Sequence, residues 1–315
     1  MCPEKIFLGL TLYDILICVG IIVCFFSFSY LADCARLKVK LQKYSLLVGV
    51  AAIAIGFGSA ILFQAIYNIE ERGGFELTLD TGATFYGGLV GGVCSFLLLY
   101  FGLSRLFFKG ELRGYPQKSF FTVAGCAVPS IIVAHAFGRL GCLTAGCCHG
   151  KVTNAWLGIM MYGDMGYRRY VPVQLFEAIF LFALFALLFI RARDGKRFSL
   201  SIYAISYGVW RFVIEYARAD YRGSIPILGL TPSQLTALLM ILVALLVIPL
   251  EMRIRSHMER EAAKDGESDA AAENAPCEET LCEESPCADA TAEKMLVDES
   301  ADAGDVDAEG GSTDE

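Results

Sequence analysis

Long apolar segments alternate with short polar connections over the first 250 residues of the chain. Each segment runs for roughly 18–23 residues, which is enough for a helix to cross a hydrocarbon core about 30 Å thick. The pattern predicts an all-α polytopic membrane protein with seven transmembrane helices. The segments lie at about 9–31, 45–67, 84–103, 119–137, 173–190, 199–217 and 231–250.

The polar connections alternate in charge. The connections at 32–44, 104–118 and 191–198 each carry four Lys or Arg residues, and further arginines follow the last segment. The connection at 68–83 is more acidic. Because cytoplasmic loops carry the excess of basic residues, this alternation places the N-terminus outside and the C-terminus in the cytoplasm.

The composition changes sharply near residue 259. Residues 259–315 contain 20 Asp and Glu against 3 Lys and Arg, a net charge of −17, whereas residues 1–258 contain 14 against 23, a net charge of +9. The acidic part has too few bulky apolar residues to offset the entropy lost on ordering. We therefore predict a membrane domain at 1–258 and a disordered acidic tail at 259–315. A basic run with interleaved aromatic residues is absent from the sequence, so nucleic acid is not an expected partner.

Ionisable side chains lie inside the sixth apolar segment. Tyr207, Arg211 and Glu215 are four residues apart and share one helix face, which Arg218 extends. Charged groups inside a membrane are costly, and they face a polar cavity or pair with one another. The pattern favours a functional cavity. A plain Arg211–Glu215 pair, with Arg218 reaching to the membrane interface, is the alternative.

A second polar stretch, AHAFGRLGCLTAGCCHG, occupies residues 134–150. Arg139 lies between Gly138 and Gly141, which allow close approach of the backbone. A guanidinium in such a glycine-rich turn suits a phosphate through paired hydrogen bonds, whereas unspecific contact with lipid headgroups is the alternative. His135, four residues earlier, is either a titrating group or a capped interfacial histidine.

The same stretch ends in a group of thiols. Cys142, Cys147, Cys148 and His149 have the spacing C-x4-C-C-H, which matches no standard zinc pattern, and adjacent cysteines seldom ligate one ion well. We therefore expect no metal and no cofactor. A disulfide such as Cys142–Cys147 is an alternative to inert buried thiols, because the loop is predicted to face outside.

Four glycines lie within the third apolar segment, in YGGLVGG at residues 86–92. Small residues of this kind favour close packing between membrane helices. A kinked or unwound segment that presents Tyr86 to a cavity is a compatible functional interpretation.

Together these motifs resemble the prolipoprotein diacylglyceryl transferase family of bacterial inner membranes. The resemblance covers about residues 5–250, with the motifs in the same order as in the family. It is carried by GRLGC (138–142) for the family's Gly-Arg-x-Gly core, YGGLVGG for its His-Gly-Gly-Leu-x-Gly block, Tyr207, Arg211 and Glu215 for its Tyr-Arg-Glu block, VPVQLFEA (171–178), and Tyr13.

The resemblance implies transfer of a diacylglyceryl group from phosphatidylglycerol to the thiol of a lipobox cysteine in a prolipoprotein signal peptide, at the bacterial plasma membrane. The implied catalytic residues are Arg139, Arg211, Tyr86, Glu215 and Tyr207. The implied substrate-binding residues are Arg139, Arg211, Tyr13, His135, Arg218, Gln174, Gly87 and Gly88.

The chain departs from the family pattern at positions that matter for chemistry. Tyr86 replaces the family's histidine, Cys142 replaces its asparagine, and the acidic position falls at or beside Cys147. A phenol with a pKa of about 10 is a poor base near neutral pH. The base is therefore open between Tyr86, His135 and His149, and we expect the arginines to contribute most, with Tyr86 orienting the substrate.

Three other functions compete with this one. The scaffold could act on similar lipids with another acceptor, or bind lipid without turnover after loss of its base. A redox role of the three cysteines is the third.

Overall fold

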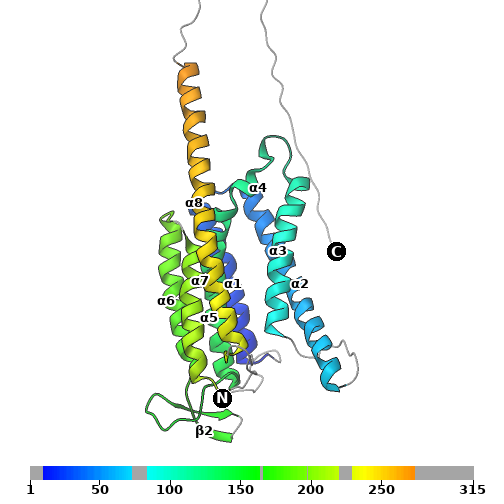
Figure 1. Cartoon of the computed structure of the whole chain (residues 1–315), viewed down its shortest axis with the longest axis vertical. Helices are drawn as coiled ribbons and strands as arrows, with labels where there is room; N and C mark the ends of the chain where they lie inside the picture. Colours follow the sequence, from blue (N-terminus) through cyan, green and yellow to red (C-terminus); the bar gives the residue numbers. More distant parts are fainter. Residues whose placement is uncertain (1–9, 73–83, 164–165, 197, 220–228, 274–315) are drawn as a thin grey trace, which may run out of the picture. The chain divides into compact units, whose positions relative to one another are not determined.

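The computed structural model describes residues 10–72, 84–163, 166–196, 198–219 and 229–273 of the chain. Helices make up most of these residues (Figure 1). The long helices are α1 (Leu12–Cys34), α2 (Val39–Arg72), α3 (Phe85–Phe107), α5 (Phe120–Ala145), α6 (Val173–Arg193), α7 (Ser199–Ile214) and α8 (Pro232–Glu273). The short elements are α4 (Tyr115–Lys118), β1 (Ile159–Gly163), β2 (Gly166–Tyr170), and 3₁₀ turns at Gly110–Leu112 and Glu215–Ala217.

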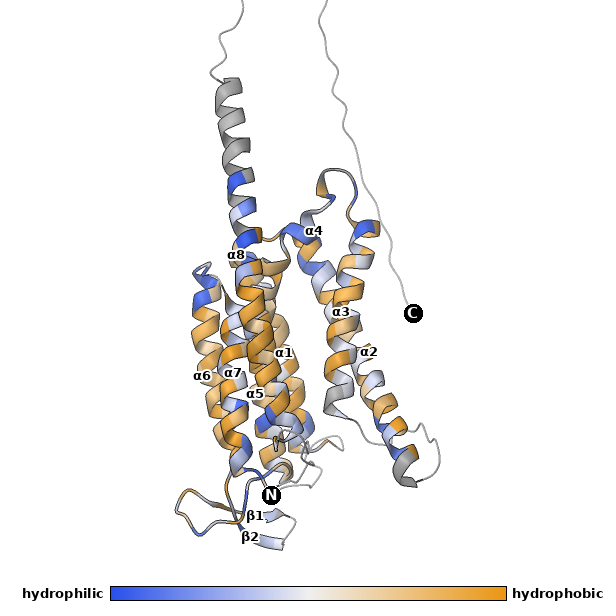
Figure 2. Cartoon of the chain, viewed as in Figure 1, coloured by the Kyte–Doolittle hydropathy of each residue, from blue (hydrophilic) through white to orange (hydrophobic). Residues whose placement is uncertain are grey.

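Within the described residues, six helices are long and apolar enough to cross a membrane, and Figure 2 shows their hydrophobic length. They correspond to six of the seven predicted segments, so the fold is that of a helical membrane protein with several spans. The remaining segment, at 199–217, forms α7. Its 16 residues rise by about 24 Å, less than the ~30 Å of a hydrocarbon core, so the seventh span stays a prediction.

Helix α5 is the centre of the bundle, in contact with α1, α6 and α7 (Figure 1). Half of its spanning window is buried inside the protein, the largest share among the six spanning helices described. Gly20 allows α1 to approach, because a Cβ at this position would lie 2.9 Å from Cβ of Phe137. Apolar side chains of α5 and α6 fill the contact between these helices, with Tyr207 of α7 beside them. The packing therefore fixes the polar side chains that lie further along the same three helices.

Glycines bring α3 against α2. A Cβ at Gly91 would lie 2.4 Å from Cβ of Ser59, and one at Gly87 would lie 2.7 Å from Cβ of Phe63. Ser59 also donates a hydrogen bond from Oγ to the carbonyl of Gly87, at 2.9 Å. The predicted small-residue packing is confirmed. The alternative of an unwound segment is wrong, because α3 is helical without interruption from Phe85 and the close contact with α2 accounts for the glycines.

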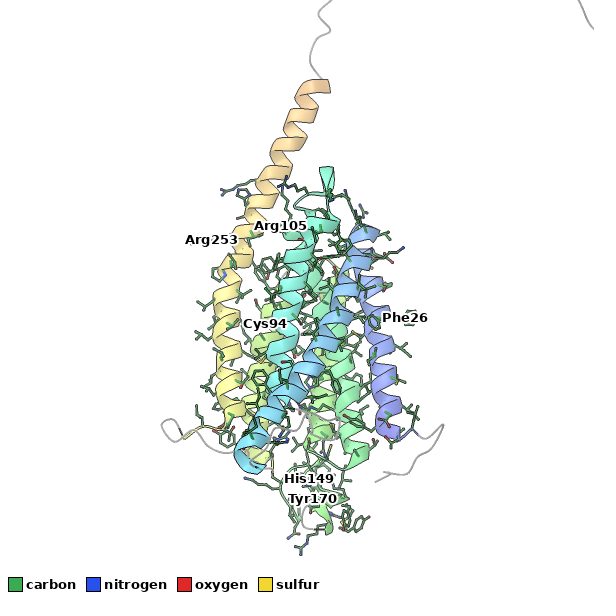
Figure 3. The ribbon with its side chains drawn as sticks, turned by 90° about the vertical axis from the view of Figure 1, so that its right-hand side faces the viewer. Phe26, Cys94, Arg105, His149, Tyr170 and Arg253 are labelled. Atoms are coloured by element: carbon green, nitrogen blue, oxygen red, sulfur yellow. The ribbon has the colours of Figure 1, made fainter. Side chains whose placement is uncertain are left out.

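The two ends of the bundle differ in chemistry. Arg105 and Arg253 lie at one end, and His149 and Tyr170 lie at the other, which we call the site end (Figure 3). The charge alternation of the sequence predicts that these two arginines share an end.

Residues 138–172, which connect the predicted segments 119–137 and 173–190, are partly helical. Helix α5 continues to Ala145, so Gly138 and Arg139 are helical and the predicted glycine-rich turn around Arg139 is wrong. Gly141 has a packing role instead, since a Cβ there would lie 2.9 Å from Cδ2 of Tyr13. Gly141 therefore lets α1 approach α5 and does not break the helix.

A small β-hairpin follows in the same region, and the all-α prediction did not include it. β1 and β2 pair antiparallel with Ile159 opposite Tyr170, and Val152 forms an additional bridge to Tyr170. The hairpin lies at the site end of the bundle (Figure 1).

Helix α8 continues to Glu273, so the predicted disorder does not hold for residues 259–273. This part is rich in Ala and Glu, which have high intrinsic helix propensity and here extend a helix that is already nucleated. By internal contacts the chain divides into Met1–Asp265 and Gly266–Glu315. The tail's Cys277, Cys282 and Cys287 lie outside the described residues.

Candidate active site

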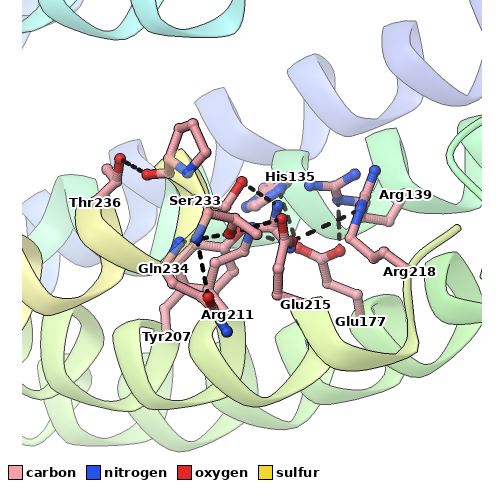
Figure 4. A network of polar contacts seen from close by, with 12 residues as sticks. His135, Arg139, Glu177, Tyr207, Arg211, Glu215, Arg218, Ser233, Gln234 and Thr236 are labelled. Carbon is pink, nitrogen blue, oxygen red and sulfur yellow. Dashed lines mark hydrogen bonds and ion pairs between the residues drawn. The ribbon is translucent and has the colours of Figure 1, made fainter. Parts of the chain in front are cut away.

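A buried carboxylate lies where α5, α6 and α7 meet. Glu177 on α6 is fully buried, and its Oε2 lies 3.1 Å from Nε of Arg139 on α5. Tyr207 on α7 donates a 2.8 Å hydrogen bond to Oε1, and Nε2 of His135 lies 4.0 Å from the same oxygen (Figure 4). A buried charge persists only where it is paired and hydrogen-bonded. Glu177 therefore joins three helices around one polar centre.

Glu177 is a site residue that was not among those predicted from the sequence. The available signal was an acidic residue inside an apolar helix, within the motif VPVQLFEA, where an isolated charge is costly. Gln174, one turn earlier, is 1% exposed and donates from Nε2 to the carbonyl oxygen of Cys147 at 2.6 Å. Gln174 therefore holds the loop after α5, in addition to any contact it makes with substrate.

A second buried carboxylate, Glu215, lies at the end of α7. Nη1 of Arg211 lies 2.7 Å from Oε2 of Glu215, and Nη2 donates to Oγ of Ser233 on α8 at 2.8 Å. Thr231 donates from Oγ1 to Oε1 of Glu215 at 3.1 Å. Arg218 is 5% exposed, with Nε 3.9 Å from Oε2. The Arg211–Glu215 pair of the alternative interpretation is present, within the polar region that the sequence favoured. The other part of that alternative, the reach of Arg218 to the interface, is wrong, because Arg218 is buried beside this carboxylate.

Figure 4 shows the two clusters as neighbouring parts of one polar region, and His135 lies within electrostatic range of both Arg139 and Arg211. The three guanidinium groups and two carboxylates of this region sum to a formal charge of +1. Charges interact more strongly in a buried setting than in water. The excess positive charge, presented by planar guanidinium donors, suits a phosphate.

The remaining predicted substrate residues lie on α1 and α3. Tyr13 packs against Gly141, one turn or less from Arg139. Gly87 and Gly88 face α2, where added Cβ atoms would meet side chains of that helix, so the structure gives them a packing role. Tyr86 is the second residue of α3, and its side chain lies outside the described part of the structure.

The end of α5 brings three thiols together. Gly146 has a left-handed backbone (φ 76°), and the amides of Gly146 and Cys147 donate to the carbonyls of Leu143 and Cys142, each at 3.2 Å. This Schellman arrangement places residues 142 and 147 next to each other. The Sγ atoms of Cys142, Cys147 and Cys148 all lie within 4.8 Å of one another.

These thiols are free, so the disulfide between Cys142 and Cys147, which the sequence left as an alternative, is not formed. Hydrogen bonding with Cys142, and to a smaller extent with Cys147, lowers the pKa of the Cys148 thiol. The positive charges of Arg218 and Arg139 act in the same direction. The thiol group therefore lies next to the arginines of the polar region.

His149 lies apart from the thiols with which the sequence grouped it. Its ring packs 4.3 Å from the ring of Tyr170, and its Nδ1 lies 3.1 Å from the carbonyl oxygen of Gly150. Gly150 in turn forms a β-bridge with Arg218. This pairing ties the loop after α5 to the end of α7, and so brings Cys148 close to Arg218.

The comparison with known proteins decides the family. A family model described as prolipoprotein diacylglyceryl transferase matches residues 5–250. The chain belongs to the prolipoprotein diacylglyceryl transferase family. The resemblance found in the motifs is thereby confirmed, and so is the class of enzyme.

Individual members of the prolipoprotein diacylglyceryl transferase family are moderately similar to the chain. A phosphatidylglycerol–prolipoprotein diacylglyceryl transferase of Clostridium tetani is 29% identical over 213 residues, covering 65% of this chain and 78% of that protein. Transferase 2 of Clostridium perfringens is 34% identical over 154 residues, covering 47% and 55%. The transferase of Dehalococcoides mccartyi is 29% identical over 216 residues, covering 64% and 75%.

Proposed function

We propose that the chain transfers a diacylglyceryl group from phosphatidylglycerol to the lipobox cysteine thiol of a prolipoprotein signal peptide. The observation that carries this proposal is the buried region in which Arg139 and Arg211 are each paired with a glutamate, and to which Arg218 adds a formal excess of one positive charge. Preorganised cations in a buried site stabilise the charge that develops on a leaving phosphate.

The reaction is a displacement at the glyceryl carbon that carries the phosphate ester. The thiolate sulfur forms a C–S bond to this carbon as the C–O bond breaks, and glycerol phosphate leaves with the bonding electrons. The thiol proton passes to a base. Arg139 and Arg211 hold the phosphate, and Glu177 and Glu215 fix the two guanidinium planes.

His135 is the better placed of the two histidines to accept the proton. Its ring lies 5.4 Å from the ring of Tyr207, inside the polar region. The ring of His149 is instead packed on Tyr170, with Nδ1 beside the carbonyl of Gly150. Tyr86 orients the substrate in this proposal.

The proposed membrane arrangement has seven spans, with the N-terminus and the site end outside and the acidic tail in the cytoplasm of a bacterial cell. The position of Arg105 and Arg253 at the end opposite the site supports it, since basic residues accumulate on the cytoplasmic side (Figure 3). Helix α7 and the 3₁₀ turn that follows it, Glu215–Ala217, together have 19 residues, which is within the length of the other predicted spans. Epitope tags at the two termini, probed with antibody before and after permeabilisation, test the arrangement; equal access of both tags would contradict it.

The transferase activity is tested with the full chain in vesicles that contain phosphatidylglycerol. A synthetic peptide with a lipobox cysteine is added, and its thioether product is measured by mass spectrometry. We expect Arg139→Ala and Arg211→Ala to lower the rate about 10²-fold or more. Arg193→Ala is the matched control, because Arg193 is half exposed and ends α6 away from the site.

Three outcomes would reject or replace the proposal. An unchanged transfer rate in both arginine variants would show that Arg139 and Arg211 do not stabilise the leaving phosphate, and would reject the proposal. Transfer only to an acceptor that is not a thiol would favour the related enzyme with another acceptor. Bound phospholipid without turnover for any acceptor would favour a lipid-binding protein that lost its base.

A further inference from the structure

Cys142, Cys147 and Cys148 form a group that the proposed phosphate chemistry does not use. Their Sγ atoms lie within 4.8 Å of one another, and Cys147 is exposed while the other two are half-buried. Tetrahedral zinc with Zn–S distances of about 2.3 Å needs sulfur atoms about 3.8 Å apart. Side-chain shifts of about 1 Å or less would therefore place all three sulfurs around one ion.

Adjacent cysteines seldom ligate one ion, but the backbone at Cys148 allows it here. Cys148 has φ 59°, a left-handed conformation that is strained for a residue with a side chain. With this conformation both consecutive thiols reach the same place as Cys142. Such strain persists only where the surroundings hold it, and here the carbonyl of Cys147 is bound by Gln174 at 2.6 Å.

The charge around the thiols fits a metal thiolate centre. Three thiolates and one Zn²⁺ carry a net charge of −1. Arg218 and Arg139 lie within electrostatic range of Cys148, so their positive charges would stabilise such a centre. Cys142 follows Arg139 by three residues on α5, so the two side chains lie on the same helix face. The group therefore borders the region assigned to the phosphate.

We propose that Cys142, Cys147 and Cys148 bind one Zn²⁺ ion as thiolates and leave its fourth coordination position open for the acceptor thiol. Among the residues that the structure describes, these cysteines form the one group of three or more His, Cys, Asp or Glu side chains close enough to share an ion. Catalytic zinc sites have this form, with three protein ligands and one exchangeable position. The sequence alone predicted no metal, because it did not show the left-handed turn at Cys148.

The role of the open position rests on the proposed transferase function, whereas zinc binding itself does not. Zn²⁺ stabilises the thiolate form of a bound thiol, so the acceptor loses its proton to solvent or to His135 on binding. The zinc-bound sulfur then forms the C–S bond, the C–O bond breaks, and glycerol phosphate leaves. Zinc has no redox chemistry, so the step needs no oxidant or reductant. The site thus supplies an activated nucleophile in a chain that has Tyr86 at the position of the family's histidine.

The first experiment measures metal bound to the full chain, purified in detergent under reducing conditions. We expect about one zinc per chain by elemental mass spectrometry, and loss of nearly all of it in the Cys142→Ser, Cys147→Ser, Cys148→Ser triple variant. The matched control replaces the tail cysteines Cys277, Cys282 and Cys287 with Ser and should retain the ion. Zinc that follows the tail cysteines, or three free or disulfide-bonded thiols without bound metal, would overturn the proposal.

The second experiment needs no variant of the chain. Replacement of zinc with Co²⁺ should give the intense near-ultraviolet band of cobalt thiolate bonds, and the lipobox peptide should increase it as a fourth sulfur binds. The same peptide with Ser in place of Cys should not. A cobalt band that the cysteine peptide leaves unchanged would overturn the open fourth position. Metal binding without any diacylglyceryl transfer would refute the transferase proposal alone, whereas full transfer by zinc-free chain would refute thiol activation by zinc alone.

Discussion

Nε of Arg139 and Oε2 of Glu177 lie 3.1 Å apart, and this ion pair joins α5 to α6 within the bundle. Glu177 has no exposed surface; Arg139 balances its charge, and the hydroxyl of Tyr207 donates a hydrogen bond to its other oxygen. The pair therefore supports the structure and also fixes the guanidinium that is assigned to the phosphate.

Glu177→Gln keeps the shape of the side chain and removes its charge. We expect the free energy of unfolding to fall by about 3–5 kcal/mol, because a buried guanidinium loses its partner. Thermal unfolding of the detergent-solubilised chain, with activity in vesicles, measures the effect. Asp194→Asn is the matched control, since Asp194 pairs with Arg193 at the surface and should contribute about 1 kcal/mol or less. An unchanged melting temperature in Glu177→Gln would show that the pair does not stabilise the bundle.

Tyr207→Phe removes only the hydroxyl that binds Glu177. A hydrogen bond to a charged group contributes about 1.5–3 kcal/mol, so we expect a loss of that size. The loss should be smaller in a chain that already carries Glu177→Gln, because the two groups interact directly. Tyr216→Phe, at an exposed tyrosine of the following turn, serves as the control. Equal effects of Tyr207→Phe in both backgrounds would mean that the hydroxyl acts elsewhere.

Local patterns in the sequence predicted the spanning helices and the face shared by Arg211 and Glu215. They could not predict that Tyr207, on that same face, binds Glu177 of another helix, since contacts between helices depend on how the bundle packs. The glycine two residues after Arg139 was misleading for the same reason. Gly141 indicates a turn when only neighbours in sequence are considered, but it is required where α5 contacts Tyr13.

Gly91→Ala tests the close contact between α2 and α3. The added Cβ would lie 2.4 Å from Cβ and Oγ of Ser59, so the helices must separate or Ser59 must move. Overpacking of this kind costs about 1–3 kcal/mol, and we expect a corresponding fall in melting temperature. Gly102→Ala on the same helix meets nothing within 4 Å and should raise helix stability slightly. Addition of Ser59→Gly should restore Gly91→Ala; failure of this rescue would contradict the contact.

Arg211→Lys separates the charge of Arg211 from its geometry. Arg211 uses Nη1 for Glu215 and Nη2 for Ser233, and a lysine keeps the positive charge but cannot make both contacts in one plane. We therefore expect kcat to fall by about tenfold or more, equivalent to roughly 1.4 kcal/mol of transition-state stabilisation, with a smaller change in KM for phosphatidylglycerol. Ser233→Ala, which removes one contact of the guanidinium, should lower kcat less. Ser256→Ala is the control on α8, because Ser256 is exposed and hydrogen-bonded only to its own helix among the contacts described. A rise in KM at constant kcat would instead mean that Arg211 binds the lipid equally in the ground state and the transition state, and its assigned role in departure of the phosphate would then be wrong.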